Sequence, residues 1–146
     1  MRNLGVCLTV TLMIVAAYAA NKEVSLEELK TRAQNAKAQD KPNLCVQIAE
    51  RQIENANKLF DDGKDEEAAA AIRDVISYSE QAGKAAGETG KRLKKTEIAM
   101  RRMSHRLSDL KRTLPYDSQA TVQEAVERLD KVRTDLLNHM FGKNPK

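Results

Sequence analysis

One apolar seam runs through the middle of the sequence and constrains its fold more than any other feature. Alternating steps of three and four residues from Ile72 to Leu114 meet an apolar or small side chain at every position. The seam consists of Ile72, Val75, Ser79, Ala82, Ala86, Thr89, Leu93, Thr96, Met100, Met103, Leu107, Leu110 and Leu114. This heptad spacing keeps one face of an α-helix apolar. It predicts a continuous helix over about 66–113, about 70 Å long at 1.5 Å per residue.

Three shorter helices are expected around the long one, over about 25–39, 43–61 and 118–141. Ser25 and Glu28 form the capping-box pattern that starts the first of them. Pro42 separates the first two helices, and Gly63 and Pro115 lie in the connections on either side of the long helix. Aromatic residues make up only 3% of the chain and charged residues 32%, a composition typical of helices rather than of a β-sandwich or barrel.

The helix lengths predict how these segments pack. The flanking helices over 43–61 and 118–141 together nearly match the long helix, so each can pair with one half of it. We therefore expect an all-α fold, an elongated set of antiparallel helical hairpins built on one long central helix. The alternative is a compact four-helix bundle, which forms if the long helix breaks near Gly87. Gly83, Gly87 and Gly90 weaken that region, because each costs a helix about 1 kcal/mol relative to Ala.

The stretch from Ala56 to Ile76 resembles the middle of a tetratricopeptide repeat. The residues that carry the resemblance are Leu59, Gly63-Lys64, Glu66-Glu67-Ala68, Ile72 and Val75. It covers about one repeat, and no similar pattern follows about 34 residues later, whereas such solenoids need at least about three units. The resemblance implies two helices packed across a glycine-containing turn. It does not imply the peptide binding of that family.

The first residues of the chain have the pattern of a secretory signal peptide. An uncharged, largely apolar run follows Arg2, and Ala17-Tyr18-Ala19 then places small residues at the two positions that signal peptidase reads. We expect cleavage before Ala20, which removes residues 1–19 and leaves a single helical domain over 20–146. The mature protein would then be exported, periplasmic or extracellular. The alternative is an uncleaved leader that is retained as a membrane anchor.

The side chains that could carry enzyme or metal chemistry do not converge in the predicted hairpins. Without the leader, Cys45 is the only thiol, and we interpret it as a small buried side chain rather than as a redox group or an intermolecular bridge. The two histidines lack a neighbouring cysteine or acid that would complete a nucleophile. The predicted register also separates the soft ligands that could hold copper, namely Met100, Met103, His105, His139 and Met140. We therefore predict no enzyme activity, no metal site and no cofactor.

Charge is distributed unevenly along the predicted long helix. Nine basic and two acidic residues lie between Lys91 and Arg112, whereas six acidic and two basic residues lie between Asp61 and Asp74. Within the basic stretch, four cations at adjacent flanking heptad positions form what we call the basic cluster: Lys94, Lys95, Arg101 and Arg102. Acidic residues of the last helix are expected to neutralise this cluster only in part. They are Glu124, Glu127 and Asp130.

The charge pattern narrows the class of function without identifying an activity. A formal charge of only +4, and a basic stretch without interleaved aromatic residues, argue against nucleic-acid binding. The basic cluster suggests a docking surface for an anionic envelope component or an acidic protein, and the alternative is a face that is merely solvated. We predict an exported, non-enzymatic helical binding or scaffold protein of the cell envelope. The alternative is a periplasmic helical-hairpin chaperone or metal-stress protein, and a homo-oligomer is left open.

Overall fold

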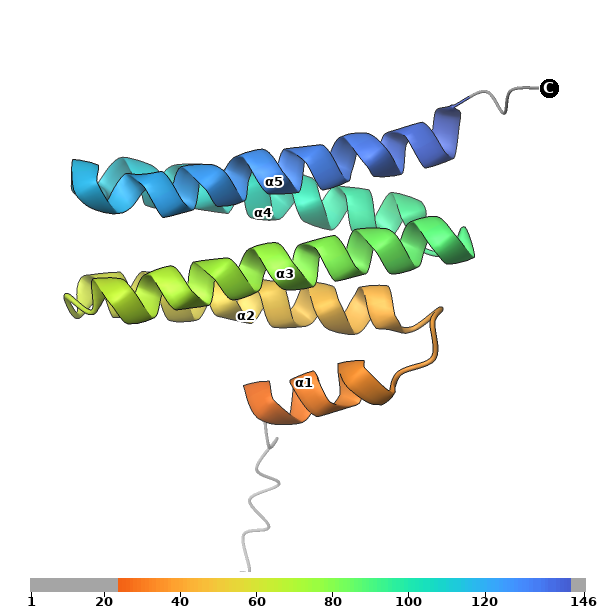
Figure 1. Ribbon diagram of the computed structural model, residues 1–146, viewed down its shortest axis with the longest axis horizontal. Helices are drawn as coiled ribbons and strands as arrows, with labels where there is room; N and C mark the ends of the chain where they lie inside the picture. The colour runs from red at the N-terminus through yellow and green to blue at the C-terminus, as the bar shows by residue number, and fades with distance from the viewer. Residues whose placement is uncertain (1–23, 143–146) are drawn as a thin grey trace, which may run out of the picture.

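The computed structural model describes residues 24–142, which form five α-helices and no strand (Figure 1). The helices are α1 (Leu26–Asn35), α2 (Lys41–Asp61), α3 (Asp65–Thr89), α4 (Leu93–Thr113) and α5 (Tyr116–Phe141). The all-α class is therefore confirmed. The leader over 1–19 and its expected cleavage site at Ala20 lie outside the described residues.

The prediction of one continuous helix over 66–113 is wrong. Gly90 ends α3 in the left-handed conformation, with φ of 64°, and α4 begins at Leu93. Glycine is suited to this cap because it lacks a Cβ. Arg92, a non-glycine residue with φ of 61°, completes the reversal of the chain. The heptad seam thus continues across a break in the helix. The break lies at Gly90, three residues beyond Gly87, near which the four-helix alternative required it.

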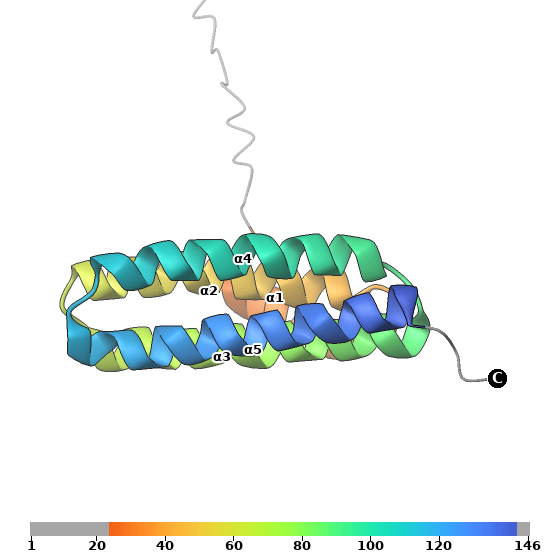
Figure 2. The same cartoon turned by 90° about the horizontal axis from the view of Figure 1, so that it is seen from above.

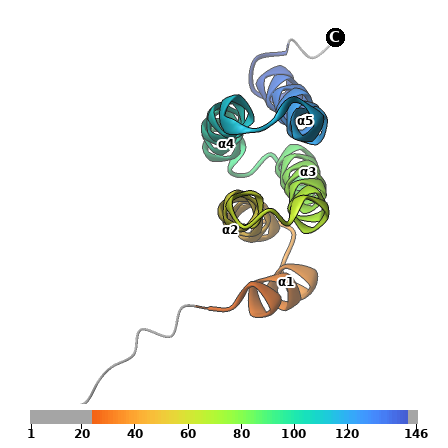
Figure 3. The same cartoon turned by 90° about the vertical axis from the view of Figure 1, so that its left-hand side faces the viewer.

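The break allows the two hairpins to stack on each other (Figure 3). In the end-on view, α4 and α5 form one layer, α2 and α3 form the next, and α1 lies below that second layer. Seen from above, α2 and α4 share one long side of the molecule, and α3 and α5 share the other (Figure 2). The fold is the four-helix alternative with α1 packed outside it, through the buried side chains of Leu29 and Ala33.

The two hairpins bury equivalent positions although their sequences differ. The buried residues of α2 include Cys45, Ala49, Gln52 and Ala56. Buried residues with the same spacing occur in α4, namely Thr96, Met100, Met103 and Leu107. The two helices of each hairpin also meet through polar side chains. Gln52 meets Asp74 across the first turn, and Ser104 meets Asp130 across the second. One continuous core therefore lies between the two layers.

Two of the glycines in α3 allow α5 to approach closely. A Cβ at Gly83 would overlap Cγ1 of Val132, and a Cβ at Gly87 would lie 2.8 Å from Nε2 of His139. The three glycines of this region therefore have two different roles. Gly83 and Gly87 provide the contact, and Gly90 provides the bend.

We expect Gly83→Ala to lower the free energy of unfolding relative to Gly87→Ala by about 1–3 kcal/mol, measured by urea denaturation. Both changes gain about 1 kcal/mol of helix propensity. They differ in the neighbour, because His139 is exposed and can swing aside, whereas the branched side chain of Val132 is half-buried against the core. Adding Val132→Ala to Gly83→Ala should remove the difference. Equal stabilities of the two single variants would show that α5 is not held this closely.

Candidate functional site

The basic cluster lies in the first half of α4, and its four members differ in the side chains that they contact. The Nζ atom of Lys95 donates to Oδ1 of Asn43 at 3.0 Å, and Arg102 forms an ion pair with Glu50. Lys94 and Arg101 are exposed and form no ion pair with any residue of the described range 24–142. Three of the four cations therefore keep a charge that no acidic side chain compensates.

The acid that does compensate part of the cluster comes from α2, not from the last helix. The sequence assigned this role to Glu124, Glu127 and Asp130 of the helix over 118–141. In the structure α5 instead supplies a cation to α4, because Nε of Arg133 donates to Oε1 of Glu97 at 2.7 Å. Asp130 accepts from the hydroxyl of Ser104 at 3.0 Å rather than from a cluster cation. The sequence does not predict the ion pair between Glu50 and Arg102, because α2 and α4 become neighbours only when the long helix breaks.

A ladder of polar contacts joins α2 to α4 along one side of the molecule. Its rungs are Asp40–Arg92 at 3.5 Å, Asn43–Lys95 at 3.0 Å, Glu50–Arg102, and Glu54–Arg106 at 3.5 Å. Each rung joins residues 52 positions apart, as expected for two parallel helices in constant register. In this ladder α2 and its N-cap Asp40 contribute the acids and the amide, and α4 and its N-cap Arg92 contribute every cation.

The ladder is interrupted between the Asn43–Lys95 and Glu50–Arg102 rungs, where the side chains are apolar. Val46 of α2 is buried at this point, and Ile98 of α4 is 39% exposed. A groove of about 510 Å³ opens there between the two helices. Its lining combines apolar residues, three members of the basic cluster, one further cation, one acid and a few neutral polar groups: Pro42, Asn43, Val46, Gln47, Glu50, Arg92, Lys94, Lys95, Thr96, Ile98, Ala99 and Arg102. Arg101 is the cluster member that does not line it.

The groove offers an apolar floor beside uncompensated positive charge. Lys94 and Lys95 lie in the first turn of α4, which contains no acidic residue. The partial positive charge of a helix N-terminus favours an anion over these two cations. An anion above Lys94 and Lys95 would therefore reduce the repulsion between these cations and the partial positive charge of the helix N-terminus. An apolar group attached to this anion could reach Ile98 and Val46.

The other residues singled out from the sequence do not assemble into a site. Cys45 is fully buried. Burial raises the pKa of its thiol, and the charge of Lys41, which lowers this pKa, has the smaller effect. Met100 and Met103 are fully buried in the core, whereas His105 and His139 are exposed on different helices. In the described part of the chain, no three His, Cys, Asp or Glu side chains are grouped as metal ligands would be. Of the helices between residues 24 and 142, none combines the length and apolar character needed to cross a membrane.

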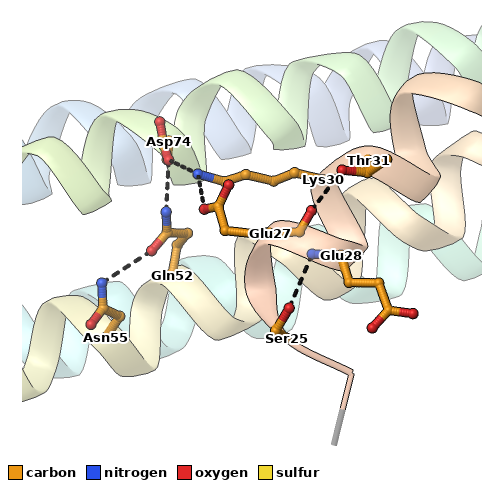
Figure 4. A network of polar contacts seen from close by, with 8 residues as sticks. All are labelled: Ser25, Glu27, Glu28, Lys30, Thr31, Gln52, Asn55 and Asp74. Atoms are coloured by element: carbon orange, nitrogen blue, oxygen red, sulfur yellow. Dashed lines mark hydrogen bonds and ion pairs between the residues drawn. The ribbon is translucent and has the colours of Figure 1, made fainter.

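A second polar centre ties α1 to the first hairpin (Figure 4). Oδ2 of Asp74 accepts from Nζ of Lys30 at 3.2 Å and from Nε2 of Gln52 at 2.6 Å. Lys30 also lies 3.7 Å from a carboxylate oxygen of Glu27, and Gln52 is almost fully buried. Partial burial lowers the pKa of Lys30, but the hydrogen bond and charge of Asp74, with the charge of Glu27, outweigh it and raise the pKa overall. These contacts hold α1 against the first hairpin.

The raised pKa of Lys30 predicts how this attachment depends on pH. A lysine whose pKa is raised by folding stabilises the protein below its ordinary pKa of about 10.5 and loses that contribution as pH rises through the folded-state pKa. At pH 7 we expect Lys30→Met to lower the free energy of unfolding by about 0.5–1 kcal/mol. In urea denaturation, the difference between the two proteins should disappear above the folded-state pKa. A difference that is the same at pH 7 and in strong alkali would show that the Lys30 charge contributes nothing.

Comparison with protein-family models, with curated proteins and with solved structures gives no match. The interpretation of function therefore depends on the groove and its charges. The α2–α4 groove is the candidate site that this geometry supports best.

Proposed function

We propose that the mature protein is an exported, non-enzymatic helical binding protein of the cell envelope, which docks an anionic partner through the basic cluster of α4. The observation that carries the proposal is the groove between α2 and α4, where cations of the cluster stand beside exposed apolar surface. The partner class that this surface fits is an anionic envelope lipid.

The uncompensated cations of the basic cluster are sufficient for measurable docking. Lys94 and Arg101 have no acidic partner between residues 24 and 142, and Lys95 contacts only a neutral amide. A cation near an anionic membrane surface contributes about 1 kcal/mol, and this attraction decays within about 10 Å at 0.1 M salt. Three such cations, close together on one helix, favour salt-sensitive adsorption to an anionic bilayer.

We expect vesicles that contain anionic lipid to bind the mature protein at low salt and to release it as salt is raised, measured by co-sedimentation. The triple variant Lys94→Gln, Lys95→Gln, Arg101→Gln should lose this binding without losing helix content. Arg102 is left unchanged because its removal would leave Glu50 without its partner.

A matched variant separates the cluster from total charge. Lys64→Gln, Lys84→Gln, Lys131→Gln removes the same charge from exposed positions outside α4 and should bind as the wild type does. If the wild type ignores anionic vesicles at low salt, or if both triple variants lose binding equally, the basic cluster is not a docking surface.

The leader pattern supports the proposed export, and export has its own test. The leader pattern predicts that the protein recovered from outside the cytoplasm begins at Ala20, or within a few residues of it, in mass spectrometry. Replacing Ala17 and Ala19 by bulky residues should block this processing, because signal peptidase reads small side chains there. A retained Met1 on the protein in the membrane fraction would support the anchor alternative instead.

A further inference from the structure

The apolar interruption in the α2–α4 ladder is small and closed at both ends. The Asn43–Lys95 and Glu50–Arg102 rungs bound it, and Lys95 and Arg102 are about 10 Å apart along α4 at 1.5 Å rise per residue. Val46, Ile98 and Ala99 supply its apolar surface. Ile98 is a large apolar side chain that remains 39% exposed on this surface.

The size of the groove decides between a small ligand and a protein partner. Its volume of about 510 Å³ falls in the range of small-molecule sites, about 300–1,000 Å³. A stable protein interface needs about 800 Å² on each partner. The apolar part of this groove is too short for that, because charged rungs replace it on either side.

The positions of the charged side chains determine how an anionic ligand would be oriented along the groove. Lys94 and Lys95 stand at one end of the groove, in the first turn of α4, without an acidic partner in the described residues. At the other end Arg102 is neutralised by Glu50. Among the cluster members that line the groove, the uncompensated charge therefore lies at the α4 N-terminal end, and the apolar surface extends from it toward the neutralised rung.

We propose that this groove binds one molecule of an anionic single-chain amphiphile. Its carboxylate, phosphate or sulfate head meets Lys94 and Lys95, and its alkyl chain covers Ile98 and Val46. This inference rests on the proposed function, because it names the lipid component that the docking surface selects. It adds a requirement that surface adsorption lacks, namely that Ile98 contributes to binding.

The proposal is tested by calorimetric titration of the mature protein with monomeric decanoate, a method that suits a chain without tryptophan. We expect a single site. Acetate, which lacks the chain, and decyltrimethylammonium, which reverses the head charge, should not bind. Ile98→Ser and the double variant Lys94→Gln, Lys95→Gln should each weaken decanoate binding at least about tenfold. Phe141→Ser, which changes another exposed apolar residue outside the groove, should leave it within about twofold.

Vesicle co-sedimentation of the same proteins distinguishes this inference from the proposed function. Vesicle binding without decanoate binding in the wild type would overturn the amphiphile site and leave the docking surface intact. Decanoate binding that survives Ile98→Ser would place the ligand elsewhere and also overturn it. An acidic amphipathic peptide that binds in the groove and displaces decanoate at equal concentration would overturn it in favour of a protein partner.

Discussion

The stacking of one helical hairpin on the other is the interaction on which the rest of this structure depends. A long helix flanked by two partners would leave each seam residue with one side in water. Stacking instead removes Ile72, Met100, Leu107 and Leu129 from solvent completely, and each such side chain contributes about 1.5–3 kcal/mol when it is fully buried. Against this gain stand the unpaired backbone groups of two new helix ends and the left-handed conformation of Arg92, about 1–2 kcal/mol.

Stacking also creates the candidate site. It brings α2 alongside α4 in parallel, and the constant spacing of 52 residues then aligns the acids of one helix with the cations of the other. At Val46 of α2 and Ile98 of α4 the polar contacts are interrupted, and the groove lies there. The same packing neutralises Arg102 while it leaves Lys94 exposed at the start of α4. The stacked fold and the candidate site are therefore both consequences of one event, the reversal of the chain between Gly90 and Leu93.

Secondary structure and hairpin pairing could be predicted well because their causes are local. The caps and proline positions located four of the helix starts to within two residues, and the turns at Gly63 and Pro115 predicted the two antiparallel hairpins. The end of α1 at Asn35 rather than near residue 39 is a small error of the same local kind. The continuity of the long helix was the serious error. Its heptad pattern is the same whether the seam is one helix or two, since Leu93 resumes the register after the turn.

The sequence by itself determined the helical class, the hairpin turns, the apolar seams and the presence of a basic cluster, because each follows from residues close together along the chain. Only the tertiary structure decided which cations are compensated and which apolar residue remains exposed among them. Glu50 lies 52 residues before Arg102, and no local pattern relates the two. Their pairing depends on the total apolar surface that stacking buries, which is a property of the whole fold and not of any segment of it.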